Sequence, residues 1–129
     1  QSGLPIRKIT SIDIDPSCES IARTMNHLEV CEDKFEAITN DMCDHHSTAD
    51  VIINTSCEHL TQEKYDAWLS MIHDHALIVL QSNNYKHPEH IRTIDSLDTF
   101  IEQSQIDVIW SGELELPLYT RYMIIGKIK

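Results

Sequence analysis

Two aspartates lie at the end of an apolar stretch near the start of the chain, Ile9-Thr10-Ser11-Ile12-Asp13-Ile14-Asp15-Pro16. Its β-branched residues favour a buried parallel strand over residues 8–15. A carboxylate at the carboxyl end of such a strand, beside a helix start, is how doubly wound folds hold the ribose of a nucleotide. Asp13 has this position, and ribose hydroxyls would supply the donors that a buried carboxylate needs. The alternative for Asp13 is a capping or loop carboxylate, and helix capping accounts for Asp15.

A second set of polar residues follows the run Val51-Ile52-Ile53, which indicates a strand over 49–55 covered on both faces. Ligands of parallel α/β sheets bind beyond the carboxyl ends of the strands, so site residues are expected at Asn54, Thr55, Glu58 and His59. Glu58 and His59 are the candidate general bases. The alternative is that both residues begin or cap the next helix. Amide and hydroxyl groups suited to orienting a substrate follow the next strand, at Gln81, Asn83 and Tyr85.

Cysteine and histidine side chains raise the question of a metal site. Zinc-type ligands would gather at Cys43, Asp44, His45 and His46 if their loop shared a sheet edge with Cys57 and His59. The spacing fits no standard Cys/His finger, and adjacent histidines rarely bind one ion, so we predict no metal. We expect His87 and His90 to be ordinary loop residues. The four cysteines include no CxxC pair and are interpreted as reduced thiols.

Hydrophobic periodicity predicts the elements that position these residues. Strands are expected over 8–15, 35–42, 49–55, 76–81, 106–116 and 118–128, and helices over 16–29, 61–73 and 96–104. Polar loops are expected over 43–48 and 82–92. Strands that alternate with helices indicate an α/β fold with a mostly parallel sheet. The last two strands meet at Pro117 with so short a joint that they must be antiparallel neighbours.

Composition narrows the class of protein and of partner. A chain of 129 residues suffices for one domain, and 41% hydrophobic with 24% charged residues is typical of a globular protein. No apolar run approaches the ~20 residues of a membrane span. The net charge of -11, from 21 acidic and 10 basic residues, argues against a surface that binds phosphate backbones. We therefore expect a cytoplasmic protein with a small-molecule substrate, without a nucleic-acid or membrane partner.

Four stretches, taken in order, resemble the class I S-adenosylmethionine-dependent methyltransferases: Ser11-Ile12-Asp13-Ile14-Asp15-Pro16, Asn40-Asp41-Met42, Asn54-Thr55-Ser56-Cys57-Glu58-His59-Leu60 and Tyr122-Met123-Ile124-Ile125-Gly126-Lys127. The resemblance implies a Rossmann-like methyltransferase fold that binds S-adenosylmethionine. In that family the acidic residue of the first stretch, here Asp13 beside Ile14, takes the ribose hydroxyls of the cofactor. The resemblance further implies that Asp41 accepts from the adenine amino group and Met42 packs on the ring. It places Asn54 and Thr55 near the reacting methyl group.

One departure from the family is large. The only glycines are Gly3, Gly112 and Gly126, so the family's glycine-rich loop is absent. That loop precedes the residues corresponding to Ile9, and we expect residues 1–129 to form a partial, N-terminally truncated domain that lacks the first βα unit. The flank exposed in this way predicts self-association. A non-catalytic Rossmann-like nucleotide-binding or interaction module is the alternative. A dehydrogenase ranks third, because the closing antiparallel hairpin suits methyltransferases better.

Overall fold

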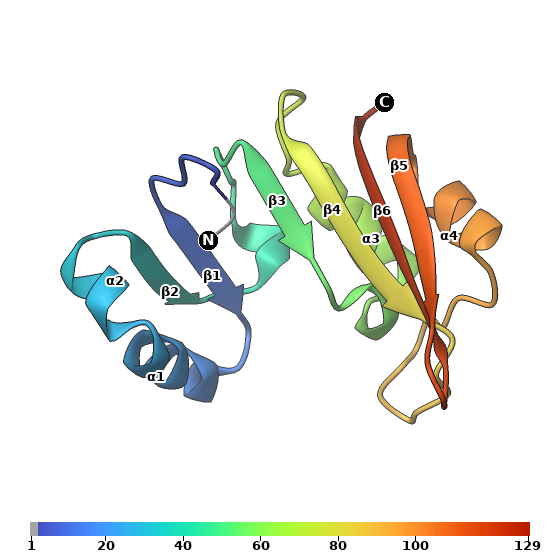
Figure 1. Ribbon diagram of the computed structural model, residues 1–129, viewed down its shortest axis with the longest axis horizontal. Helices are drawn as coiled ribbons and strands as arrows, with labels where there is room; N and C mark the ends of the chain where they lie inside the picture. The colour runs from blue at the N-terminus through green and yellow to red at the C-terminus, as the bar shows by residue number, and fades with distance from the viewer. Residues whose placement is uncertain (1–2) are drawn as a thin grey trace. The chain divides into compact units, whose positions relative to one another are not determined.

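The computed structural model describes residues 3–129, which form two compact units. The first unit ends at His45, and the second runs from His46 to Lys129 (Figure 1). That the two units together form one partial domain over residues 1–129 stays a prediction. None of the helices within residues 3–129 is long and apolar enough to cross a membrane.

The first unit is a βαβ arrangement. It contains β1 (Ile9–Asp13), α1 (Pro16–Met25), α2 (His27–Cys31), β2 (Phe35–Thr39) and the short 3-10 helix η1 (Met42–Asp44). β1 and β2 are parallel, with Ile9 opposite Phe35 and Asp13 opposite Thr39. The predicted cap of α1 is confirmed, because the Asp15 carboxylate accepts from the Ser17 N–H at 2.8 Å.

The helix predicted over 16–29 is divided into α1 and α2 at Asn26. The side-chain amide of Asn26 donates to the Ala22 carbonyl at 2.8 Å, and the residue leaves helical geometry at φ -112°, ψ 34°. Asparagine competes in this way with the backbone bonds of a helix. Periodicity does not register such a break, because Met25 and Leu28 keep the helical spacing on both sides of it.

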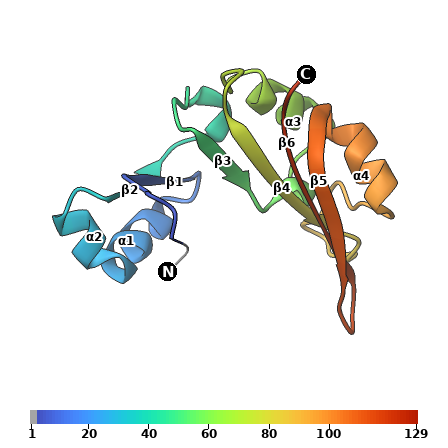
Figure 2. The ribbon, with the colours of Figure 1, turned by 45° about the horizontal axis from the view of Figure 1, so that its top comes forward.

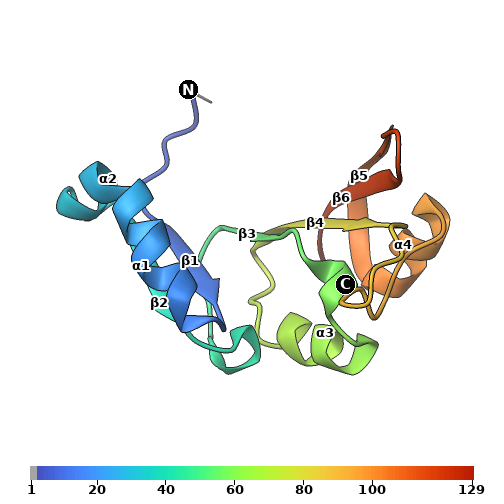
Figure 3. The same ribbon diagram turned by 90° about the horizontal axis from the view of Figure 1, so that it is seen from below.

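The strand predicted over 8–15 is present as β1, but the prediction that it is buried is wrong. Ile9 is 50% exposed and Ile14, just beyond the strand, is 66% exposed, whereas Ala37 of β2 is buried. Only α1 and α2 are available to cover the two strands within the described part of this unit (Figure 3). One layer of helices covers one face of a sheet, so the other face keeps its apolar side chains exposed.

The second unit is built on a four-stranded mixed sheet. Its elements are β3 (Val51–Asn54), the 3-10 helix η2 (Cys57–His59), α3 (Gln62–Leu69), β4 (Leu77–Asn83), α4 (Leu97–Ser104), β5 (Ile106–Glu115) and β6 (Thr120–Ile128). The strand order is β3-β4-β6-β5, with β3 and β4 parallel and β6 antiparallel to both of its neighbours. The predicted closing hairpin is thereby confirmed, and Figure 2 shows β5 and β6 running together as a long ribbon.

The core of the second unit lies between the sheet and its two helices. α3 and α4 cover the same face (Figure 3), where the buried Tyr65 hydroxyl donates to the Ser104 carbonyl at 2.7 Å. Ile78, Leu80 and Ile124 are fully buried beneath them. On the strand that was expected to be covered on both faces, Val51 is 49% and Ile53 is 64% exposed, so that expectation is wrong. Within the described residues of this unit, helices cover one face of the sheet only.

The fourth strand extends further than predicted. β4 ends at Asn83 instead of residue 81, because Ser82 and Asn83 pair with Tyr122 and Arg121 of β6. Gln81, the last residue of the predicted strand, therefore lies inside β4, opposite Met123, and Asn83, predicted in the following loop, ends the strand. The end of β4 is set by pairing with β6, which is distant in the sequence. The polarity of the residues near position 81 therefore predicted the end of the strand wrongly.

Candidate functional site at the carboxyl ends of the strands

The same local turn follows strand ends in both units. The side-chain oxygen of the terminal residue accepts the backbone N–H two residues further on, which makes an Asx turn. The distances are 2.9 Å from Asp13 to Asp15, 3.0 Å from Asn54 to Ser56 and 2.9 Å from Asn83 to Tyr85. Asp41, just beyond β2, makes the same bond to the Cys43 N–H at 2.9 Å. The chain turns sharply at each of these points.

The loops that follow β3 and β4 meet, because the two strands are parallel neighbours. Glu58, in η2, is 7% exposed, and its Oε1 accepts from Nδ2 of Asn83 at 2.9 Å. The sequence analysis assigned Glu58 to catalysis and Asn83 to substrate binding, and the structure brings both into one hydrogen bond. Buried polar groups joined in this way are held in fixed orientations.

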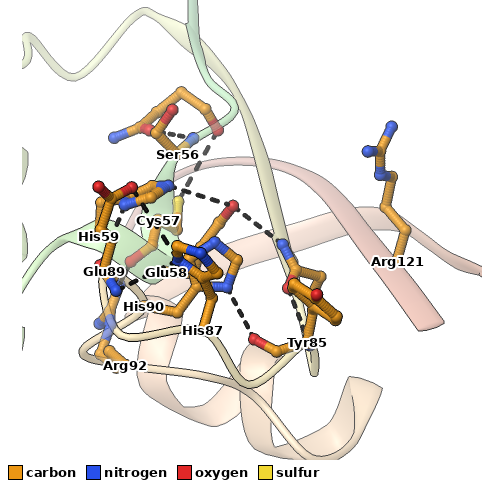
Figure 4. A network of polar contacts seen from close by, with 12 residues as sticks. Ser56, Cys57, Glu58, His59, Tyr85, His87, Glu89, His90, Arg92 and Arg121 are labelled. Carbon is orange, nitrogen blue, oxygen red and sulfur yellow. Dashed lines mark hydrogen bonds and ion pairs between the residues drawn. The ribbon is translucent and has the colours of Figure 1, made fainter. Parts of the chain in front are cut away.

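The loop after β4 folds back over η2 (Figure 4). The Arg92 backbone N–H donates to the Glu58 carbonyl at 3.0 Å. Nδ1 of His90 lies 2.7 Å from the Tyr85 carbonyl oxygen, and Nδ1 of His59 lies 3.1 Å from the Glu89 carbonyl oxygen. The His59 and His90 rings are 4.7 Å apart between centroids, at 87°. The second unit thus gathers Glu58, His59, Asn83, Tyr85 and His90 at one edge.

Burial sets the chemistry of the two groups beneath this edge. Cys57 is fully buried, and desolvation raises the pKa of its thiol to about 12, although the charge of Arg92 opposes the shift. The thiol therefore stays neutral at physiological pH and is not a nucleophile. The Arg92 guanidinium lies 4.7 Å from the Tyr65 ring centroid and donates to the Cys57 carbonyl at 3.3 Å. Burial also raises the pKa of Tyr65. The Cys57 thiol and the Tyr65 hydroxyl therefore stay protonated at physiological pH.

The first unit holds the other predicted cofactor residues. Asp13 is exposed at the end of β1, with the Cys18 thiol beside it; desolvation raises the pKa of this thiol, and the nearby Asp13 and Asp15 carboxylates raise it further. A cavity of about 40 Å³, which Asp13 and Cys18 help to line, is much smaller than a nucleoside. Ile14 is exposed, and Asp41 and Met42 form the start of η1.

The predicted cofactor-binding residues are divided between the two units. Asp13, Ile14, Asp41 and Met42 belong to the first, and Asn54 and Thr55 belong to the second. Asn54 is buried at the end of β3, and Thr55 is exposed. Of the predicted substrate residues, Gln81 pairs within β4, and Tyr85 packs its ring 5.6 Å from that of Tyr119.

His90 is the member of the cluster that sequence reasoning missed. It was expected to be an ordinary loop residue, and its distance along the chain from His59 gives no indication that the two lie close together. A signal does exist in the predicted elements. Histidines that follow two neighbouring parallel strands emerge at the same sheet edge, so His90 after β4 had a reason to lie near His59 after β3.

Comparison with known proteins gives matches in structure only. No protein-family model matches the sequence, and no curated protein does either. Magnesium protoporphyrin IX methyltransferase (ChlM) from Synechocystis PCC 6803, solved with bound SAM, is similar with a TM-score of 0.70 at 12% identity. The match covers 95% of this chain and 60% of ChlM.

Two further structures show the same likeness. N-methyltransferase NodS from Bradyrhizobium japonicum WM9 has a TM-score of 0.65 at 12% identity, over 94% of this chain and 73% of NodS. The protein aTrm5, solved in complex with tRNALeu, has a TM-score of 0.65 at 17% identity, over 95% of this chain and 35% of aTrm5. Sequence identities this low show a similarity of fold only. The chain has the α/β, Rossmann-like fold of the class I S-adenosylmethionine-dependent methyltransferases.

Proposed function

We propose that this chain forms most of a methyltransferase domain that transfers a methyl group from S-adenosylmethionine to a small-molecule acceptor. The observation that carries the proposal is the sheet order β3-β4-β6-β5 with its reversed β6, in a fold shared with methyltransferase structures. The chain spans 60% of ChlM and 73% of NodS, so the activity of a whole enzyme is part of the proposal. The net charge of -11 favours a small acceptor over nucleic acid.

Asp13 would hold the cofactor ribose. It is exposed at the end of β1, and its Oδ1 already accepts the Asp15 N–H. A carboxylate has about four acceptor sites, so one backbone bond leaves capacity for two hydroxyl donors. This donor and acceptor chemistry fits a ribose. Ile14 and Met42 would pack on the cofactor, and Asp41, Asn54 and Thr55 would contact its polar groups. When bound, the cofactor supplies an electrophilic methyl group on its sulfonium.

The second unit would position the acceptor and take its proton. His59 Nδ1 faces a carbonyl oxygen, which can only accept, so this nitrogen carries the hydrogen and Nε2 keeps a free lone pair. That lone pair can remove a proton from the acceptor. Glu58 is buried, and its hydrogen bond to Asn83 fixes the orientation of its carboxylate. The carboxylate can therefore hold its charge close to Nε2 of His59, which lies 3.9 Å from Oε1. Asn83, Tyr85 and Gln81 are the proposed substrate contacts.

Calorimetric titration of S-adenosylhomocysteine into the full-length protein tests the proposal. Asp13→Asn is the informative variant, because an amide oxygen can still accept the Asp15 N–H while the charge is removed. We expect affinity to fall at least tenfold, roughly 1.4 kcal/mol. Asp15→Asn is the matched control, because Asp15 makes an equivalent turn to Ser17 and is assigned no ligand.

Two outcomes would count against the proposal. Absence of binding by the wild-type protein would favour a non-catalytic module with the same fold. Equal affinities for the Asp13→Asn and Asp15→Asn proteins would remove Asp13 from the cofactor site while leaving the fold assignment intact.

A further inference from the structure

We propose that Glu58, His59 and His90 form a binding site for a divalent first-row transition-metal ion such as Zn²⁺. One ligand atom from each residue can be chosen so that all three lie within 4.8 Å of one another. Nε2 of His59 lies 3.9 Å from Oε1 of Glu58. Figure 4 shows these side chains converging from η2 and from the loop after β4. All three residues belong to the second unit.

Both histidines are already oriented as metal ligands. Nδ1 of each ring lies within hydrogen-bond distance of a backbone carbonyl, at 3.1 Å for His59 and 2.7 Å for His90. A carbonyl oxygen only accepts, so each Nδ1 carries the hydrogen and each Nε2 presents its lone pair. Metal-bound histidines in proteins almost always donate their second ring N–H to such a partner, which fixes the tautomer and the ring direction.

Glu58 supplies an unsatisfied negative group at the same place. Its carboxylate is buried, Oε1 accepts from Asn83, and Oε2 has no hydrogen-bond partner within residues 3–129. No lysine or arginine in the described part of the chain forms an ion pair with it. An unpaired buried carboxylate oxygen is costly, and a bound cation removes the cost.

The ligand set selects the kind of ion. Imidazole nitrogens favour zinc, copper, iron and nickel, whereas magnesium and calcium prefer sites made of oxygen atoms only. Two histidines with one carboxylate leave at least one coordination position open, as in catalytic zinc sites. Zinc holds its ligands at about 2.0–2.2 Å, so the ligand atoms must approach to roughly 3.3 Å from one another. The loop carrying His90 is the part that would close.

Metal binding by Glu58, His59 and His90 does not require that the protein transfers methyl groups. If the proposed function holds, the open coordination position would take an oxygen or nitrogen of the acceptor and favour loss of its proton. His59 would then be a ligand through Nε2 and could not also be the base. The two roles of His59 are therefore separable by experiment.

Titration of the metal-free full-length protein tests the site, with Zn²⁺ followed by calorimetry and Co²⁺ by its visible absorption. We expect one ion per chain, with affinity at least about tenfold lower in the His90→Ala variant and in the Glu58→Gln variant. The glutamine keeps an amide oxygen for Asn83 while removing the charge. His75→Ala is the matched control, because His75 is an exposed histidine of the same unit outside the cluster.

Two results would overturn the proposal. One is the absence of stoichiometric binding by the wild-type protein. The other is equal affinity for the His90→Ala and His75→Ala proteins, which would indicate scattered binding to surface groups. His90 lies in a loop, so its variant reports on the ion even if Glu58→Gln does not fold. Binding of S-adenosylhomocysteine is measured separately, so failure of the metal site leaves the proposed function tested on its own.

Discussion

Cys57 should make the stability of the folded protein fall in mild alkali. Its side chain is fully buried, and desolvation raises the pKa of the thiol from the ordinary 9.0 to about 12. The folded state therefore binds the thiol proton more tightly than the unfolded state does. The stabilising contribution is complete below pH 9, the pKa of the unfolded chain. It is lost as the pH rises from 9 towards 12.

The size of the effect follows from these two pKa values. At pH 10 the unfolded thiol is mostly ionised while the folded thiol is almost wholly protonated, so the free energy of unfolding falls by about 1 kcal/mol relative to pH 7. The loss grows as the pH rises further and levels off near pH 12, where the folded thiol also ionises. A loss of this size is a large fraction of the stability of a small protein.

Urea unfolding of the wild-type and Cys57→Ala proteins at pH 7, 8, 9 and 10, under reducing conditions, measures the effect. The variant starts from a lower stability because a buried side chain is removed, but the extra fall between pH 7 and 10 should be absent. Tyr65 titrates in both proteins, so the difference between them isolates the thiol. Cys31→Ala removes an exposed thiol and is the control. A difference in the fall of less than about 0.5 kcal/mol would refute the assignment of a raised pKa to Cys57.

Three further substitutions test the packing of the second unit by urea unfolding. Gly126→Ala places a Cβ against the Asp107 carbonyl and 2.9 Å from Cδ1 of Ile106. The substitution should lower the free energy of unfolding by about 2–3 kcal/mol. A decrease under about 0.5 kcal/mol would mean that β5 and β6 can separate there. Tyr65→Phe leaves the buried Ser104 carbonyl unpaired, at about 2 kcal/mol, and a neutral result would show that water replaces the hydroxyl. Thr61→Ala removes the bond from the Lys64 N–H to the N-cap of α3, at about 1 kcal/mol, whereas Thr61→Ser should restore it.

Much of the fold was accessible from the sequence, because its signals are local. The apolar run Val51-Ile52-Ile53, the N-cap pair Asp15-Pro16 and the short joint at Pro117 each fix an element or a strand direction. The burial of β1 and β3 was not accessible in this way. Periodicity indicates which residues are apolar, but the number of layers that cover a sheet depends on elements elsewhere in the chain.

For the candidate site, the residues could be predicted from the sequence but their contacts could not. Glu58, His59 and Asn83 could be predicted from their positions just after or at the ends of apolar strands. Their contacts could not, since the Glu58–Asn83 bond joins residues 25 apart, and His90 reaches the cluster only because residues 84–92 fold back over η2. The path of a polar loop is decided by long-range hydrogen bonds such as that from Arg92 to Glu58, and no local pattern encodes it.

The Asx turns that close the strands in each unit separate the local path of the backbone from the local charge. Asp13 and Asp41 make with a carboxylate oxygen the same backbone bond that Asn54 and Asn83 make with an amide oxygen. Either residue type satisfies the turn. Exchanging one for the other at any of these positions would change the local charge by one unit while the backbone keeps its course. A single substitution at a strand end of this chain would therefore shift the preference of that end between cationic and neutral ligands while the turn is kept.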